Sequence, residues 1–284
     1  MTSSAPQTAP KTFFITGVST GFGRTLTEAA LAAGHRVVGT LRDEAARTAF
    51  ERLSPGRAFG RILDVTDIAA IAPLVDAIER EIGPIDVLVN NAGYGHEGLV
   101  EEAAMADIRR QFEVNVFGAV AAIQAVLPYM RKRRAGRILN VTSMGGIVTF
   151  PGVGIYHGSK FALEGISETL GKEVKSLGIY VTAVAPGGFR TDWAGRSLVR
   201  AERKIADYDD LFEPLRQRRQ EMSGRQVGDP VKAAQAMLKL VESDDPPAHL
   251  LLGSDAVKFV REKIAALESD IAGWETVSLS TDAT

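Results

Sequence analysis

The amino-acid sequence predicts a single doubly wound α/β domain, with a central parallel sheet of about seven strands flanked by helices. Short runs rich in valine and isoleucine alternate along the chain with longer segments whose apolar residues recur at helical spacing. Runs that are apolar at nearly every position are typical of parallel strands buried on both faces. The alternation requires right-handed crossovers, which place helices on both faces of one sheet.

Each predicted element follows from its local pattern. Seven runs share the composition of buried strands: TFFIT, RVVGTL, RILDV, IDVLVNN, GRILNVTS, IYVTAVAP and HLLLG. The segments between them repeat apolar residues at intervals of three and four, which predicts helices over residues 21–33, 67–82, 104–131 and 156–177. Neither an internal repeat nor a linker interrupts residues 12–253, so we expect one domain there.

Three segments differ in composition from the core of this domain. A disordered tail is predicted over residues 1–11 and a charged, helical C-terminal extension over residues 254–284. Residues 191–228 are highly charged and contain a few large apolar residues, among them Trp193. Two interpretations of this segment stay open: a helical insertion on the surface, or a lid over a substrate pocket.

Composition excludes several classes of function. The net charge of −2 gives no basic field for nucleic acid. The absence of cysteine excludes disulfides and cysteine nucleophiles, and the four dispersed histidines lack the spacing of a metal site, so no metal is expected. The N-terminus has no signal-peptide features, and no apolar run reaches the ~18 residues that span a bilayer. We therefore expect a cytoplasmic protein without a membrane partner.

A glycine-rich segment, FFITGVSTGFGRTL, joins the first predicted strand to the first helix. Gly17, Gly21 and Gly23 permit a tight turn and a close approach of the backbone to a ligand. The N–H groups at the start of a helix attract phosphate. The other loop residues implied in this contact are Ser19, Thr20 and Phe22. The segment predicts a site for the pyrophosphate of a dinucleotide.

The end of the second predicted strand indicates which dinucleotide is bound. A site for NAD usually has a carboxylate here, which accepts from the 2′-hydroxyl of the ribose. This chain has Leu41 at that place and Arg42 next, and a guanidinium suits a 2′-phosphate. We therefore favour NADP(H), with NAD(H) as the alternative because Asp43 is placed to pair with the arginine.

The ordered set of motifs over residues 12–253 resembles the short-chain dehydrogenase/reductase superfamily. The resemblance is carried by TGVSTGFG, by NNAG after the fourth strand, by PGGFRT after the sixth strand, and by a tetrad of Asn115, Ser143, Tyr156 and Lys160. It implies a Rossmann-type fold and an NAD(P)-dependent oxidoreductase. Members of this family commonly form dimers or tetramers.

The resemblance also implies which other residues contact the cofactor. They are Asp64 and Val65 at the adenine, the backbone of Asn91, Ala92 and Gly93, the nicotinamide segment with Pro186, Gly187, Phe189 and Thr191, and the catalytic pair Tyr156 and Lys160. Phe189 is bulkier than the residue usual at its place and is expected to shape the roof of the pocket. From the sequence alone, Asp64 is also a candidate cap for the helix that begins near Asp67.

The stretch PGVGIYHGSKFALEG places Tyr156 and Lys160 one helical turn apart. Interconversion of a carbonyl and an alcohol needs a hydride carrier and a group that exchanges one proton with the substrate oxygen. An ammonium next to a tyrosine is expected to lower the phenol pKa from about 10. Ser143 can donate to the substrate oxygen, whereas a water-holding role for Asn115 depends on the resemblance. His157 is expected to border the pocket or an interface.

We therefore expect an NADP(H)-dependent oxidoreductase acting on a carbonyl or secondary alcohol of a fairly apolar small molecule. The predicted pocket residues are Tyr94, Phe150, Val153 and Trp193. The alternatives are an NAD(H)-dependent dehydrogenase, an epimerase or dehydratase, and a non-catalytic nucleotide-binding regulatory protein. A homo-oligomer is expected through the helices over 104–131 and 156–177, with a dimer favoured over a tetramer.

Overall fold

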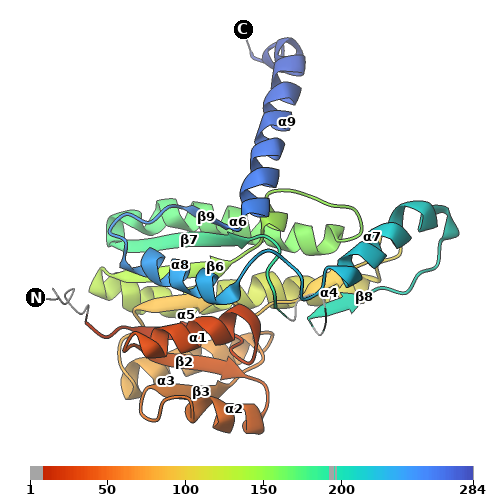
Figure 1. Cartoon of the computed structure of the whole chain (residues 1–284). Helices are drawn as coiled ribbons and strands as arrows, with labels where there is room; N and C mark the ends of the chain where they lie inside the picture. The colour runs from red at the N-terminus through yellow and green to blue at the C-terminus, as the bar shows by residue number, and fades with distance from the viewer. Residues whose placement is uncertain (1–8, 192–194, 196, 284) are drawn as a thin grey trace, which may run out of the picture.

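The central feature of the computed structural model is a parallel sheet of seven strands (Figure 1). The structure describes residues 9–191, 195 and 197–283, so most of the predicted N-terminal tail and Trp193 lie outside it. The strand order is β3-β2-β1-β4-β6-β7-β9. Their bounds are β1 (Thr12–Ile15), β2 (Arg36–Leu41), β3 (Ala58–Ile62), β4 (Val87–Asn90), β6 (Gly136–Val141), β7 (Ile179–Pro186) and β9 (His249–Leu252).

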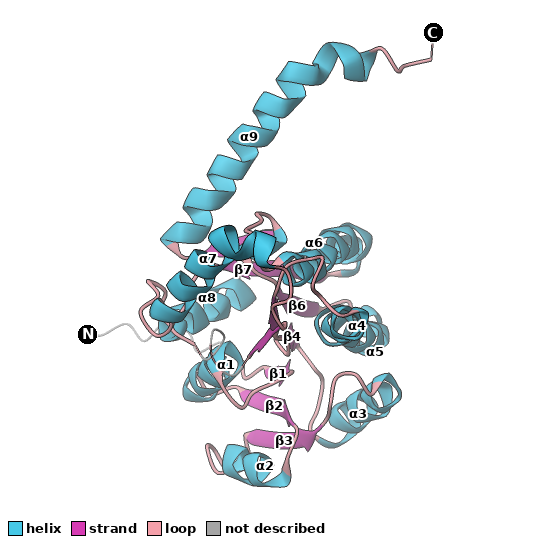
Figure 2. Ribbon diagram, turned by 90° about the vertical axis from the view of Figure 1, so that its right-hand side faces the viewer, coloured by secondary structure: helices cyan, strands magenta, loops and turns pink. Residues whose placement is uncertain are grey.

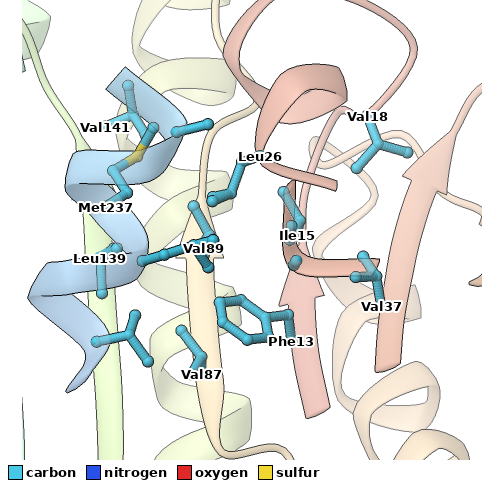
Figure 3. Close-up of a cluster of buried hydrophobic side chains, with 14 of the residues drawn as sticks. Phe13, Ile15, Val18, Leu26, Val37, Val87, Val89, Leu139, Val141 and Met237 are labelled. Carbon is cyan, nitrogen blue, oxygen red and sulfur yellow. The ribbon is translucent and has the colours of Figure 1, made fainter. Parts of the chain in front are cut away.

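Helices cover both faces of this sheet, as the second view shows (Figure 2). One layer contains α1 (Gly21–Ala32), α2 (Glu44–Glu51) and α8 (Pro230–Glu242), and the other contains α3 (Ile68–Glu81), α5 (Gly118–Arg133) and α6 (Gly154–Val174). Each layer closes its own hydrophobic core against the sheet. On the first face, Phe13 and Val89 of the sheet meet Leu26 of α1 and Met237 of α8 (Figure 3). The predicted fold class is confirmed.

The strand order also positions the site. Strand β1 lies between β2 and β4. From β1 the chain first extends the sheet to one edge, which ends in β3, and its second half then extends the sheet to the opposite edge, which ends in β9. In such sheets a crevice opens at the carboxyl ends of the strands, at the point where the order reverses. The glycine-rich loop after β1 and the NNAG segment after β4 therefore meet in this crevice.

Several elements differ from the sequence prediction. Strand β3 covers residues 58–62 instead of 61–65, which leaves Asp64 and Val65 in the loop that follows. The helix predicted over 104–131 is divided into α4 (Met105–Phe112), a π-helix (Glu113–Phe117) and α5. A short parallel pair, β5 (Gly95–Glu97) with β8 (Leu198–Arg200), was not predicted.

The continuous helical stretch Met105–Arg133 is long and apolar enough to cross a membrane by composition alone. Its side chains Ala122, Val126 and Met130 are instead buried in the core of the second layer, against α3 and the sheet. Of the most apolar window of this stretch, 39% is buried inside the domain.

Two helices lie at the margin of the domain. Helix α7 (Asp209–Glu221) follows β8 within the segment predicted as an insertion or lid. Helix α9 (Ser254–Leu279) forms the predicted C-terminal extension and projects away from the rest of the molecule (Figures 1 and 2).

Candidate active site

Two close backbone contacts shape the loop between β1 and α1. Gly17 has a φ of +71°, and a Cβ there would lie 3.1 Å from the Cα of Ala92. A Cβ on Gly23 would lie 2.2 Å from the carbonyl oxygen of Gly17. The first N–H groups of any helix have no intrahelical acceptor, and Thr20, the N-cap of α1, makes no side-chain hydrogen bond to them. This arrangement suits a bound phosphate.

The NNAG segment is fastened to the same loop. The Thr16 hydroxyl accepts from the N–H groups of Asn91 and Ala92, both at 3.0 Å. The Asn91 amide donates to the carbonyl oxygens of Thr16 and Gly17, at 3.0 and 2.8 Å. The two segments expected to contact the cofactor therefore form one hydrogen-bonded unit.

Arg42 lies at the end of β2, at the same edge of the sheet, and is exposed. Asp43 does not pair with it, because the Asp43 carboxylate caps α2 by accepting from the N–H of Ala46 at 2.8 Å. Within the described ranges, Arg42 makes neither a hydrogen bond nor an ion pair. Its guanidinium is thus available to an anionic ligand.

Asp64 is held in the loop after β3. Its carboxylate accepts from the backbone N–H and hydroxyl of Thr66 at 2.9 and 2.8 Å, and from Arg110 at 3.2 Å. The N–H of Thr66, the hydroxyl of Thr66 and the charge of Arg110 together lower the pKa of Asp64. The alternative interpretation of Asp64 as a helix cap is wrong, because Asp67 caps α3. Val65, the second adenine candidate, is almost fully buried.

The segment after β7 is held by a residue that the sequence did not single out. The N–H of Gly188 donates to the Asp255 carboxylate at 2.7 Å. A Cβ on Gly187 would lie 2.2 Å from that carboxylate, so only glycine lets it approach. Asp255 belongs to the first turn of α9 and comes 67 residues later in the chain, so no local motif links it to the loop.

The other predicted nicotinamide contacts begin at Pro186, the last residue of β7. The ring of Phe189 is buried and packs edge-on against Phe22, with centroids 5.1 Å apart. Phe189 is therefore part of the hydrophobic core on the α1 face as well as a candidate contact. The side chain of Thr191 lies beside Gly21, at the entrance to the glycine-rich loop.

Tyr156 and Lys160 lie in the first two turns of α6, and both are buried. The Lys160 ammonium lies 5.9 Å from the centroid of the Tyr156 ring and donates to the carbonyl oxygen of Val141 at 2.8 Å. Tyr156 is hydrogen-bonded to Ser143, which follows β6. The fold thus brings three of the four predicted catalytic residues together from α6 and the end of β6.

Burial determines the protonation of this group. It raises the pKa of Tyr156 to about 12, although the hydrogen bond with Ser143 acts in the opposite direction. Burial lowers the pKa of Lys160 to about 8, against the opposing charge of Glu164. The sequence predicted that Lys160 lowers the pKa of Tyr156, whereas in this structure burial raises that pKa and the bond to Ser143 is the opposing influence. Near neutral pH the phenol keeps its proton.

Glu164 continues the series on the same helix face, one turn beyond Lys160, and was not singled out from the sequence. It is buried and accepts from His249 at 2.8 Å and from the Thr142 hydroxyl. Three polar residues at intervals of four, which share one face of the helix, were the available signal.

Asn115 occupies the π-helix between α4 and α5. Its amide donates to the carbonyl oxygen of Tyr94 at 3.0 Å and to the Ser159 hydroxyl at 3.1 Å, and its Oδ1 accepts from the N–H of Tyr94 at 3.1 Å. A Cβ on Gly93 would lie 3.1 Å from Asn115 Oδ1 and 3.6 Å from Lys160 Nζ. Glycine at position 93 therefore leaves space between the two side chains. Single-turn π-helices are frequent at functional sites.

His157 performs a structural task, and its ring lies 5.9 Å from that of Tyr156. Its Nδ1 lies 2.7 Å from the carbonyl oxygen of Gly145, and its Nε2 accepts from the N–H of Phe150 at 3.0 Å. The ring is therefore neutral, with its proton on Nδ1. His157 ties the loop that begins with Ser143 to α6, so it neither borders the pocket nor faces outward.

A pocket of about 450 Å³ lies next to the start of α6. It is lined by Gly98, Leu99, Val100, Glu101, Phe150, Pro151, Gly152, Gly154 and Tyr208. Of the predicted pocket residues, Phe150 contributes to this wall, whereas Tyr94 and Val153 do not. Val153 is buried and pairs with Gly98 as an isolated bridge. Trp193 lies outside the described residues.

The described part of residues 191–228 is held against the domain by buried ion pairs. Glu97 accepts from Arg200 at 3.0 Å and from Arg219 at 2.9 Å. Glu102 accepts from the Arg203 side chain and from two backbone N–H groups. The segment is therefore fastened by specific contacts on both sides of the pocket.

Comparisons with known proteins agree with this geometry. A family model described as short chain dehydrogenase matches residues 11–200. Oxidoreductase BOA17 of Botryotinia fuckeliana is 37% identical over 275 residues, covering 95% of this chain and 99% of that protein. The 3-ketodihydrosphingosine reductase of Bacteroides thetaiotaomicron is 37% identical over 246 residues, covering 86% and 88%.

Solved structures show the same likeness. A short-chain dehydrogenase from Streptomyces avermitilis has a TM-score of 0.90 at 38% identity, covering 99% of this chain and 100% of the other. A short chain dehydrogenase/reductase from Burkholderia phymatum, in complex with NAD, has a TM-score of 0.80 at 26% identity, covering 92% and 95%.

Proposed function

Because the chain belongs to the short-chain dehydrogenase family, and is therefore an oxidoreductase that uses a nicotinamide cofactor, we propose that it reduces the carbonyl group of a largely apolar molecule with NADPH. The observation that carries the proposal is the buried group of Tyr156, Ser143 and Lys160 beside the end of β6. The bound cofactor supplies the hydride, and the chain supplies the proton and the polar contacts.

Tyr156 donates the proton to the carbonyl oxygen. Its raised pKa means that the phenol is protonated near neutral pH, as a general acid must be. The Ser143 hydroxyl donates a hydrogen bond to the same oxygen as negative charge develops on it. The positive charge of Lys160 stabilises the tyrosinate left behind. These roles favour reduction over the reverse reaction in the structure as it stands.

Lys160 and Asn115 return a proton to Tyr156 after it has protonated the substrate. The space beside Gly93 adjoins both Lys160 Nζ and Asn115 Oδ1, and both atoms are suited to hold a water molecule. Asn115 is kept in place by its bonds to Tyr94 and Ser159. A proton passes from the ammonium to Tyr156, and solvent recharges Lys160 along this path.

The preference for NADPH is supported by Arg42, an exposed guanidinium without a partner in the described part of the chain. Leu41 offers no carboxylate to a ribose hydroxyl, and Asp43 is engaged at α2. A 2′-phosphate would therefore meet an uncompensated positive charge at this edge of the sheet.

The proposed substrate class is a ketone with an apolar chain. The pocket near α6 presents Leu99, Val100, Phe150 and Pro151. It includes Gly154 at the start of α6, the helix that also carries Tyr156, and we assign it to the chain of the substrate. The relative named 3-ketodihydrosphingosine reductase gives independent support for a 3-keto group on a long apolar molecule. We also assign residues 198–221 as the lid of this pocket, because Tyr208 contributes to its wall.

A matched substrate series tests this proposal. Oxidation of NADPH should be followed with straight-chain 3-ketoesters from four to sixteen carbons, and again with NADH. We expect kcat/KM to rise with chain length and to be at least tenfold higher with NADPH. Preference for the shortest ketone would refute the assignment of the pocket, and preference for NADH would refute the role of Arg42.

A further inference from the structure

Helix α6 carries a buried carboxylate on the same face as two of the reacting residues. Tyr156, Lys160 and Glu164 follow one another at intervals of four, so their side chains lie one above the other along the helix. Lys160 and Glu164 are each only 6% exposed. Burying a charged group is costly unless it is paired and hydrogen-bonded. Neither the proton transfer nor the relay assigned to Tyr156 and Lys160 uses Glu164, so its burial at this position requires an explanation.

The side chains of Lys160 and Glu164 reach neighbouring residues at the end of β6. The Lys160 ammonium donates to the carbonyl oxygen of Val141 at 2.8 Å, and the hydroxyl of Thr142, the next residue, donates to the Glu164 carboxylate. Residues four apart on a helix have their Cβ atoms about 5–6 Å apart. The ammonium and the carboxylate are therefore held on the same side of α6, with opposite charges near each other.

The Glu164 side chain is fixed from two further directions. His249, the first residue of the edge strand β9, places its Nδ1 2.8 Å from the carboxylate. This nitrogen donates, because an ionised carboxylate only accepts hydrogen bonds. On the other side, a Cβ on Gly146 would lie 2.8 Å from the Cγ of Glu164, so the loop after β6 packs closely against the side chain. These contacts leave the carboxylate little freedom to move away from Lys160.

The charge of Glu164 acts directly on Lys160. Burial lowers the pKa of Lys160 to about 8, and the charge of Glu164 opposes this lowering. The side chains that reach the same group from other elements, Asn115 of the π-helix and Ser143 after β6, are uncharged. Without the carboxylate, the ammonium would therefore lose its proton at a lower pH.

We propose that Glu164 is a positioning residue of the reaction, whose carboxylate, fixed between β6 and β9, keeps the positive charge on Lys160 beside Tyr156. Its effect on reduction rests on the proposed function, in which this charge stabilises the tyrosinate and supplies the next proton. Its effect on Lys160 itself does not. If Glu164 only tied α6 to β9, Lys160 would titrate in the same way without the charge of Glu164.

The first test measures the pKa of Lys160 without any substrate. The full chain, labelled with ¹³C at the ε-carbon of lysine, is titrated by NMR over about pH 6 to 10. The signal of Lys160 is identified by its loss in Lys160→Met. In Glu164→Gln, which keeps the size of the side chain against Gly146, the pKa of Lys160 should fall by about one pH unit. An unchanged pKa would overturn the proposal.

Glu168→Gln is the matched control. Glu168 continues the series on α6, lies 3.7 Å from the Nε2 of His249 and forms an ion pair with Lys172. It is two turns from Lys160, about 12 Å along the helix axis. The variant changes the net charge by the same amount and should leave the pKa of Lys160 unchanged, because solvent and salt screen a half-exposed charge at this distance. An equal fall in both variants would show that net charge, and not the position of Glu164, acts on Lys160, and would also overturn the proposal.

The second test follows the pH dependence of kcat for the reduction of a ketone by NADPH. The charge on Lys160 is fully present below its pKa and is lost as the pH rises through it, so kcat falls on the alkaline side. In Glu164→Gln this fall should begin about one pH unit lower. At about pH 8, kcat should then be about fivefold below the wild type, while at about pH 6 the two should agree within about twofold.

The outcomes of the two tests separate this proposal from the proposed function. A kcat lowered by the same factor at every pH, with the pKa of Lys160 unchanged, would show that Glu164 has a structural role only and would overturn the proposal. A lowered pKa of Lys160 with an unchanged pH profile of kcat would support the hold of Glu164 on this charge. That result would instead refute the part that Lys160 plays in the proposed function.

Discussion

Replacement of His157 by leucine should loosen the loop that carries Ser143 without touching the reacting atoms. His157 is 4% exposed and contacts the backbone of Gly145 and Phe150 through its two ring nitrogens. Leucine has a similar size but neither donor nor acceptor. The variant therefore leaves one carbonyl and one N–H of the loop without their partner.

The magnitude follows from these two bonds. A buried polar group left unpaired costs about 1–3 kcal/mol, so we expect the free energy of unfolding to fall by about 2–6 kcal/mol in His157→Leu. Because Ser143 begins the same loop, kcat should fall at least tenfold, while cofactor affinity stays within about threefold. His157→Gln, which keeps a donor and an acceptor, is the matched control and should lose less on both measures.

The pH dependence of stability provides a second readout. Burial lowers the pKa of His157 in the folded state, so the unfolded chain binds the proton more readily. The contribution of neutral His157 to the free energy of unfolding is fully present above the pKa of the unfolded chain, about 6.5, and is lost as the pH falls below that value. In urea unfolding between pH 5 and 8, the free energy of unfolding should fall less steeply towards low pH in His157→Leu than in the wild type. Equal stability, kcat and acid slope in variant and wild type would refute the structural role of His157.

Three further predictions address the cofactor and the lid. Arg42→Ala should raise the KM for NADPH about tenfold or more and leave that for NADH nearly unchanged in steady-state assays; an equal effect on both would contradict the 2′-phosphate contact. Glu97→Gln should lower the free energy of unfolding by about 3–5 kcal/mol in urea titrations, because two arginines lose their buried counter-ion. An unchanged free energy of unfolding would show that the ion pairs do not fasten the lid. Gly187→Ala should weaken cofactor binding at least tenfold by fluorescence titration, because its Cβ displaces the Asp255 carboxylate, and tight binding would contradict that role.

Local patterns predicted the parts of the fold that depend on local interactions. The glycine-rich loop and helix α6 have strong signals over a few residues. Helix α1 begins at the predicted residue and ends one residue early, and α6 begins two residues and ends three residues before its predicted bounds. Strands β5 and β8 are three residues long and about 100 residues apart in sequence, so neither run shows a period that identifies it. Their pairing depends on tertiary contacts, including the bond of Glu97 to Arg219.

The features of the site that the sequence did not predict also depend on contacts between distant parts of the chain. Tyr156 and Lys160 were identified from the ordered set of motifs along the chain, of which their one-turn spacing is one local part. Asp255 was missed because it reaches the loop after β7 from a distant helix. The direction of the Tyr156 pKa shift was also wrong at first, because burial depends on everything packed around the phenol and cannot be obtained from the spacing to one ammonium.

The proton transfer by Tyr156 is tested most directly by one single-turnover measurement. Tyr156→Phe should be mixed with NADPH and a ketone that the wild-type enzyme reduces, and absorbance should be followed after NADPH binding has been verified by fluorescence. We predict unchanged NADPH affinity within about threefold and hydride transfer slowed at least ~1000-fold, because the oxygen no longer receives its proton. Hydride transfer within tenfold of the wild-type rate would contradict the role of Tyr156 as the acid.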